Sequence, residues 1–261
     1  MQFSTLASSS SGNSTLVSRG DDHILIDAGI SCRRIMAALA ALHADPAGIA
    51  GVLITHEHDD HISGLATLCK KTGVPVYASP GAAEGIRARF PDTDISIRVI
   101  SPETPFAVGP FTVRAFRTSH DAKESVGYRL TADGRSMALA TDLGFVSEEV
   151  LQALTGVHAV ILEANHDPDM LKYGPYPSSL KRRIASDRGH LSNRICGRLA
   201  AMLYESGTRF FVLAHLSQEN NTPDLAREAV EAGLKDAGAV LGQNAFVYVA
   251  PSGHLGEMVV V

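Results

Sequence analysis

The stretch "THEHDDH" (residues 55–61) places three histidines and two aspartates in seven positions, directly after the apolar run "GVLI" (51–54). A short apolar run of this kind is typical of a buried strand, and functional side chains commonly lie where such a strand ends in a loop. His56 and His58 are two residues apart, so on an extended segment both point to the same side and can hold one metal ion. Imidazole and carboxylate ligands together suit zinc, manganese or iron. The stretch therefore predicts a metal site at the end of a buried strand.

Other candidate ligands also stand at the ends of apolar, β-rich runs. His120, Asp142 and His215 each end such a run, and strand ends along one sheet edge can converge although they are far apart in the chain. A carboxylate such as Asp142 can bridge two ions about 3.5–4 Å apart, the separation typical of two-metal hydrolytic sites. Room for a shared water remains, as a catalytic site requires. We expect one ion to have His56, His58, His120 and Asp142 as ligands, and the other to have Asp60, His61, Asp142 and His215.

The composition is that of an ordinary globular protein. Of the 261 residues, 45% are hydrophobic and 20% are charged, and the formal net charge is −5. An anionic partner must therefore be held by a local basic patch. The start of the chain lacks the positive and apolar regions of a secretory signal, and no apolar stretch approaches the ~20 residues that span a bilayer. Three cysteines without metal-site spacing fit reduced thiols, so we expect a cytoplasmic protein with no membrane partner.

Apolar runs rich in β-branched residues alternate with segments whose apolar residues recur at helical spacing. This alternation, with both hairpins and crossovers, predicts an α/β layered fold with mixed sheets. The segment "TADGRS" (131–136) predicts a hairpin turn, and no linker-like segment divides the chain, so we expect one domain over residues 1–261. We expect strands within 14–17, 23–29, 51–56, 74–79, 111–120, 126–130, 136–142, 158–165, 209–217 and 246–250, and helices within 31–44, 63–73, 193–207 and 223–238.

Five motifs in this order resemble those of the metallo-β-lactamase fold hydrolases. They are "LIDAG" (25–29), "THEHDDHISGL" (55–65), "TSH" (118–120), "TDLG" (141–144) and "LAHLS" (213–217). The resemblance implies an αββα sandwich, in which two mixed β-sheets are flanked by helices and the site lies at one edge. It also implies that Asp27 is not a ligand but supports the loop of His56 to His61.

Two further stretches are similar to the final part of the tRNA 3′-processing endonucleases of this fold. These are "ILEAN" (161–165) and "RGHLSN" (188–193), in which Glu163 and His190 match residues that lie beside the metals. By this resemblance His190 protonates the leaving oxygen of a phosphodiester, while Glu163 keeps its imidazole charged and oriented.

The narrowest resemblance is to the YycJ/WalJ group of bacterial proteins, which is associated with 5′→3′ exonuclease activity on DNA. It is carried by "LASSSSGNSTLV" (6–17), "LEANHD" (162–167) and "KRRIASDRGHLSN" (181–193), although Ala7 to Ser10 stand where an early glycine is expected. The resemblance implies a nuclease with two divalent ions, zinc or manganese, with iron also compatible. DNA is favoured over RNA as the substrate, and a homodimer is plausible because no inserted clamp domain is present.

The resulting hypothesis is a phosphodiesterase that uses a metal-bridging hydroxide, with Asp60, His190 and Glu163 as catalytic residues. Two alternatives stay open. One is a hydrolase of small phosphodiesters such as cyclic nucleotides, or of thioesters or lactones. The other is a nucleic-acid-binding or regulatory module whose metals are structural. Tyr173 and Tyr176 are expected to pack in a proline-rich loop rather than to stack on a base. The residues expected to contact substrate are Ser10, Ser11, Asn13, Arg182, Arg183, Arg188, Ser192 and Asn193.

Overall fold

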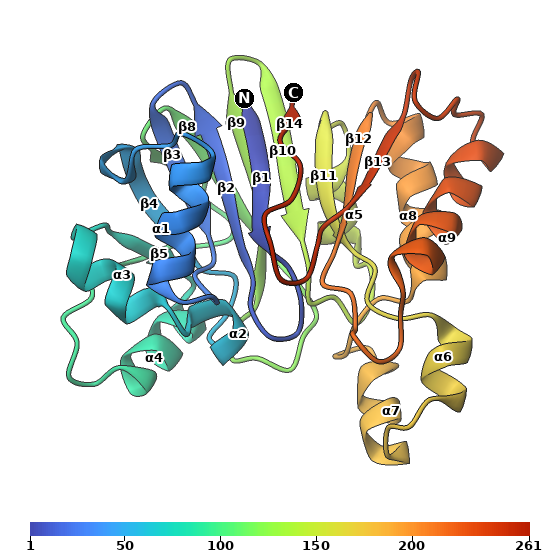
Figure 1. The fold of residues 1–261 in the computed structure, drawn as a ribbon, viewed down its shortest axis with the longest axis horizontal. Helices are drawn as coiled ribbons and strands as arrows, with labels where there is room; N and C mark the ends of the chain where they lie inside the picture. The colour runs from blue at the N-terminus through green and yellow to red at the C-terminus, as the bar shows by residue number, and fades with distance from the viewer.

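The computed structural model describes residues 1–261 and contains two seven-stranded β-sheets that lie face to face (Figure 1). The strands of the first sheet, in spatial order, are β14 (Val259–Val260), β1 (Gln2–Ala7), β2 (Ser14–Arg19), β3 (Asp22–Ile26), β4 (Ile49–Leu53), β5 (Val76–Ala78) and β6 (Ile97–Val99). Those of the second are β13 (Phe246–Val249), β12 (Phe210–Ala214), β11 (Ala159–Glu163), β10 (Arg135–Ala140), β9 (Val126–Ala132), β8 (Phe111–Arg117) and β7 (Phe106–Val108). Both sheets are mixed, since β3 to β6 are parallel, as are β10 to β13, and the other pairs are antiparallel.

Helices cover the outer face of each sheet (Figure 1). On the first sheet these are α1 (Cys32–Ala41), α2 (Asp59–Ile62), α3 (Leu65–Thr72) and α4 (Pro80–Arg89), with a short 3₁₀ turn at Pro46–Gly48. On the second they are α5 (Glu148–Leu154), α8 (Asn193–Glu205) and α9 (Pro223–Asp236). The two remaining helices, α6 (Pro168–Tyr173) and α7 (Ser178–Ile184), project together below the end of the second sheet. None of the helices has the length and apolar character needed to cross a membrane.

Three apolar cores hold these layers together, one between the sheets and one between each sheet and its helices. The parallel central strands are covered on both faces, which is why they read as near-continuous apolar runs in the sequence. In β11, for example, all five residues of "AVILE" are buried. The αββα arrangement confirms the fold class predicted from the sequence.

All ten expected strands and all four expected helices are present, together with elements that the sequence did not reveal. The predicted hairpin turn joins β9 to β10, with Asp133 and Gly134 at φ angles of 50° and 72°, as a tight two-residue turn requires. Strand β1 was missed because its "QFSTLA" sequence is partly polar. Helix α4 was missed because Gly81 and Gly85 lower its helical propensity.

Candidate metal centre

The loop that carries His56, His58 and His61 is fixed by one buried carboxylate. Asp27, directly after β3, accepts hydrogen bonds from the backbone N–H of Thr55 (2.8 Å) and from the Thr55 hydroxyl. Its Oδ2 also lies 2.8 Å from Nδ1 of His61, at the other end of the loop. Asp27 is only 2% exposed, so these contacts place it as a support of the loop, the position that the family resemblance implies.

The backbone of this loop packs so closely against the backbone at Gly29 that a side chain at that position would not fit. A Cβ atom at Gly29 would lie 1.6 Å from the carbonyl oxygen of Asp60, which explains the glycine that ends "LIDAG". The N–H of Asn13 donates to the same carbonyl at 2.8 Å, and its side-chain amide lies 3.1 Å from Nε2 of His61. Asn13 is buried. Although we predicted a substrate contact for Asn13, the structure assigns its side chain to holding the ligand loop.

Three of the site residues have a left-handed backbone. Asp27, Asp142 and His215 have φ angles of 62°, 58° and 55°, and they follow the ends of β3, β10 and β12. This conformation is uncommon outside glycine and persists only where the surrounding structure fixes it, often at functional sites. The chain thus turns sharply where strands from both sheets reach the same edge.

The predicted ligands fall into two groups, and within each group the ligand atoms lie within 4.8 Å of one another. Asp142 forms a further group with His56 and His61. Its Oδ1 lies 3.7 Å from Nε2 of His120 and 3.6 Å from Nδ1 of His215. Asp142 therefore lies between the two groups, where a bridging carboxylate would be. The groups are His56, His58 and His120, and Asp60, His61 and His215.

Two features of the ligand side chains suit bound cations: buried polar atoms without a partner, and a neutral imidazole at His56. Oδ2 of Asp142 and Nε2 of His215 are buried without a hydrogen-bond partner. Nε2 of His56 faces Nδ1 of His58 at 3.1 Å, and burial holds the pKa of His56 well below its ordinary value. A neutral imidazole has a lone pair to offer, and ligands must be deprotonated to bind metal. The residues therefore fit two divalent ions with nitrogen and oxygen ligands.

A buried carboxylate pairs with two histidines beside these groups. Oε1 of Glu163, at the end of β11, lies 2.8 Å from Nδ1 of His190 and 2.9 Å from Nδ1 of His215. Its Oε2 accepts hydrogen bonds from the backbone N–H groups of Leu143 and Leu191. Burial favours the neutral form of Glu163, but His190 and His215 together outweigh it and keep the pKa of this carboxyl below its usual range. In turn, burial opposes the charged form of His190, but Glu163 and Asp142 together outweigh it and raise the pKa of His190.

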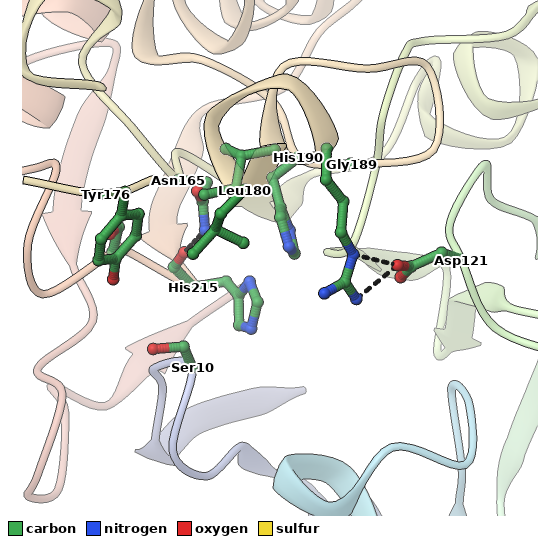
Figure 2. Close-up of a pocket in the computed structure, with 11 residues that line it drawn as sticks. Ser10, Asp121, Asn165, Tyr176, Leu180, Gly189, His190 and His215 are labelled. Carbon is green, nitrogen blue, oxygen red and sulfur yellow. Dashed lines mark hydrogen bonds and ion pairs between the residues drawn. The ribbon is translucent and has the colours of Figure 1, made fainter. Parts of the chain in front are cut away.

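A cleft of about 180 Å³ opens beside this pair (Figure 2). Figure 2 shows Ser10, a predicted substrate contact, on one side of the cleft, with Leu180 and His190 on the other. Asn165 also lines the cleft, and its amide donates to the carbonyl oxygen of His215 at 2.9 Å. The cleft therefore gives a ligand direct access to His190 and His215.

Sequence reasoning missed Asp121, which lines the same cleft. Its Oδ1 lies 3.2 Å from Nε2 of His120, and its Oδ2 accepts hydrogen bonds from the guanidinium of Arg183 at 2.5 Å. Burial alone would raise the pKa of Asp121, but Arg183 and His120 lower it. The available signal was its position directly after a predicted ligand. Arg183, a predicted substrate contact, thus lines the cleft while ion-paired to Asp121. Dashed lines in Figure 2 mark the interactions of Asp121.

Three further residues that we expect to contact substrate are exposed, and they differ in how close they lie to the cleft. Ser11 is exposed in the loop next to Ser10. The guanidinium of Arg188 lies 3.4 Å from the carbonyl oxygen of His120, close to the ligands. Arg182 points into a different hollow, between α6 and α7.

Ser192 and Asn193 are buried at the start of α8. The Ser192 hydroxyl accepts a hydrogen bond from the N–H of Ile195, as an N-cap residue does. The Asn193 side chain exchanges hydrogen bonds with the side chain of Asn221. The structure therefore gives these two predicted substrate contacts another role, which is to hold the beginning of the helix that follows His190.

The two tyrosines of the proline-rich loop differ in their surroundings. Tyr173 is 74% exposed at the end of α6, so the expectation that it packs in the loop is wrong. Tyr176 lines the cleft (Figure 2). Both rings are therefore accessible to a ligand.

Replacing Asp27 by asparagine should weaken metal binding without removing a ligand. The carboxylate lies 2.8 Å from Nδ1 of His61, and such partners orient a metal-binding imidazole and raise its basicity. Loss of an outer partner of this kind typically costs about 10–100-fold in metal affinity. Competition with a chromogenic chelator measures this change in Asp27→Asn. An affinity equal to that of the parent protein would contradict the supporting role of Asp27.

Removing the ions should make stability sensitive to alkaline pH. Burial opposes the charged form of His215, but Asp142 and its neighbours outweigh it and raise the pKa of His215 to about 10. Protonated His215 therefore stabilises the folded ion-free protein fully below pH ~6.5, the ordinary histidine pKa, and this contribution is lost as the pH rises toward 10. We expect the free energy of unfolding of the chelator-treated protein to fall by a few kcal/mol over this range, since one pKa unit corresponds to about 1.36 kcal/mol.

Urea titrations at several pH values measure this dependence, with the metal-loaded protein as the control. Bound ions replace the proton on His215, so the loaded protein should lack this loss. Ion-free protein that gains stability between pH 6.5 and 10 would refute the expectation.

Comparison with known proteins agrees with this geometry. Residues 22–216 match the family model described as "Beta-lactamase superfamily domain". The chain is 37% identical to exodeoxyribonuclease YycJ of Bacillus anthracis, over 93% of this chain and 92% of that protein. It is 34% identical to exodeoxyribonuclease WalJ of Streptococcus pneumoniae, over 95% and 93% of the two chains.

Solved structures share the fold at lower identity. The metallo-β-lactamase fold protein YhfI of Bacillus subtilis superposes with a TM-score of 0.74 at 18% identity, over 98% of this chain and 99% of that one. The match to the family model covers the segments that carry Asp27, the histidine loop, His120, Asp142 and His215. The chain therefore belongs to the beta-lactamase superfamily and has the metallo-β-lactamase fold.

Proposed function

We propose that the protein is a metal-dependent exonuclease that removes nucleotides from DNA in the 5′→3′ direction. The observation that carries this proposal is the pairing of buried Glu163 with partly exposed His190, which faces a cleft directly beside two groups of metal-ligand side chains. Hydrolysis of a thioester needs no proton donor for its thiolate leaving group, whereas a nucleotide alkoxide does. Support also comes from YycJ and WalJ, which are named exodeoxyribonucleases and match this chain over more than nine tenths of its length.

The two groups of ligands would hold zinc or manganese, with Asp142 between them. Such ions, when bound, supply Lewis acidity and lower the pKa of a coordinated water toward ~7. Of the two ligand carboxylates, Asp60 is more exposed than Asp142, with 23% of its side chain accessible against 3%, and its Oδ2 lies 3.4 Å from Nε2 of His61. We assign to Asp60 the orientation of the attacking water, in addition to its place among the ligands.

The protein's own residues would then complete the reaction on the other side of the phosphate. His190, held protonated by Glu163, donates its proton to the leaving oxygen. Arg188 and Arg183 lie where a guanidinium can contact the phosphate oxygens. Three free, buried cysteines suit a reducing compartment, and we place the protein, as one domain over residues 1–261, in the cytoplasm.

The decisive experiment uses linear duplex DNA with distinguishable labels at its 5′ and 3′ ends, incubated with the protein and Mn²⁺. We expect early release of the 5′ label as a mononucleotide and no release in the presence of a chelator. Labelled RNA of the same sequence and a repeat with Zn²⁺ test the choice of substrate and metal. Turnover of a chromogenic thioester or lactone, without cleavage of either nucleic acid, would replace this proposal with the small-substrate alternative.

A further inference from the structure

A second hollow, of about 420 Å³, lies between α6 and α7, apart from the cleft at the metal centre. Three cationic side chains line it, those of Lys172, Lys181 and Arg182, and no acidic residue does. None of the three forms an ion pair, in contrast to neighbouring Arg183, which is bound to Asp121. The hollow therefore carries positive charge that no ion pair neutralises, in a chain whose net charge is −5. Such a hollow suits an anionic ligand.

A buried polar group forms part of the same hollow. His166 is 4% exposed, and its Nδ1 atom has no hydrogen-bond partner. Burial lowers the pKa of His166 to about 4, so the ring is neutral and offers one N–H donor and one acceptor. Unpaired buried polar groups are rare in native proteins, and bound ligands or ions are among the usual reasons for them.

An exposed aromatic ring stands beside this hollow. Tyr173 follows Lys172 at the end of α6, and the Lys172 ammonium lies 4.8 Å from the centre of the Tyr173 ring. With 74% of its surface accessible, Tyr173 is the most exposed large hydrophobic residue of the chain. Aromatic rings next to cationic side chains are the common means of binding single-stranded nucleic acid, because each base can stack on a ring.

Helix α7 separates the hollow from the cleft. Leu180, Arg183 and Ile184 line the cleft, whereas Lys181 and Arg182 line the hollow on its other side. A helix with its side chains is about 10 Å across, which is longer than the ~3.4 Å axial spacing of neighbouring phosphates in duplex DNA. A strand that enters the cleft therefore needs further nucleotides to pass α7 and reach the hollow.

We propose that this hollow, lined by Lys172, Lys181, Arg182 and His166, binds a backbone phosphate of the nucleic-acid strand beyond the nucleotides held in the cleft. Tyr173 stacks on a base next to that phosphate. The inference rests on the proposed nuclease function and adds a second contact point for the strand. A free mononucleotide offers the same phosphate chemistry, so the test must separate a strand from a free nucleotide.

The test compares Ser178→Glu with Ser178→Gln in the metal-loaded protein. Ser178 is exposed and lines the hollow, and its side chain makes no hydrogen bond, so both variants should fold, and only the first adds a negative charge. Lys172→Glu is a second variant, with Lys71→Glu on α3 as its charge-matched control. The substrates are a dinucleotide, a decanucleotide and bis(p-nitrophenyl) phosphate, which is too small to span both sites.

For Ser178→Glu and Lys172→Glu we expect KM for the decanucleotide to rise by roughly five- to tenfold, with kcat unchanged and a shallower dependence on salt. Ser178→Gln and Lys71→Glu should resemble the parent, and all variants should cleave the dinucleotide and the p-nitrophenyl ester normally. Equal KM values for Ser178→Glu and Ser178→Gln would overturn the second contact point.

The remaining outcomes distinguish a failure of this inference from a failure of the proposed nuclease function. If a free mononucleotide inhibits the parent and the variants lose only this inhibition, the hollow binds product rather than a strand, and the inference is wrong. If the parent cleaves the p-nitrophenyl ester but no DNA or RNA, the proposed nuclease function itself fails. Cleavage of the decanucleotide by all variants at the parental KM leaves the nuclease function intact and removes the inference alone.

Discussion

Asp142→Asn should yield a folded protein that no longer retains two divalent ions and turns over DNA at least ~10³-fold more slowly. Asp142 is 2% exposed, and its two oxygens lie 3.4 Å from His61 and 3.7 Å from His120, in different ligand groups. An amide removes the negative charge and turns two N–H donors toward imidazoles that must act as ligands. Losing several kcal/mol of transition-state stabilisation by the ions corresponds to about this factor, at 1.36 kcal/mol per tenfold.

Metal content after dialysis, circular dichroism and kcat on labelled DNA give the three measurements that this prediction needs. Asp59→Asn is a matched control, since it makes the same chemical change close by in the chain. Asp59 is 69% exposed and pairs with Arg89 rather than with the ligands, so metal content and rate should be preserved. If Asp142→Asn kept two ions and the parental rate, Asp142 would not be a bridging ligand.

The site residues that could be predicted from the sequence are those that follow the end of a strand. Asp27, Asp142 and His215 each follow a buried strand. The apolar run that identifies the strand therefore also shows where the side chain lies, at the end of that strand. Because the strands of both sheets end at one edge, the seven predicted ligands lie close together although they are spread over residues 56 to 215. The layered fold followed from the same alternation of strands and helices.

What the sequence could not provide are contacts made by local turns and helices outside the sheets. The directions of the Asn13 and Asn193 side chains depend on their buried polar partners, Asp60 and Asn221, respectively. No periodic pattern in the sequence predicts these partners. Helices α6 and α7 are only six and seven residues long, too short for an amphipathic pattern to be recognised. The exposure of Tyr173 and the hollow beside it therefore became apparent only in three dimensions.

His190→Ala should retain both metal ions and yet cleave DNA about 10²–10⁴-fold more slowly, the usual contribution of a general acid. His190 has 20% of its side chain accessible at the cleft and is held by Glu163 at 2.8 Å. The p-nitrophenolate leaving group of bis(p-nitrophenyl) phosphate departs without a proton, so the same variant should hydrolyse this ester at close to the parental rate. His254→Ala, which alters an exposed histidine far along the chain, is the control for the loss of an imidazole.

The pH dependence separates a proton donor from a residue that merely fills space. As a donor His190 must be protonated, and Glu163 raises its pKa, so activity on DNA should fall on the alkaline side as His190 loses its proton. Glu163→Gln removes the charge that outweighs burial, which lowers the pKa of His190 and should move this alkaline limb to lower pH. Because Glu163 also contacts His215, metal content must be shown to be unchanged in this variant. An equal loss of rate on DNA and on the p-nitrophenyl ester in His190→Ala, with an unmoved alkaline limb in Glu163→Gln, would assign the pair to structure rather than to proton transfer.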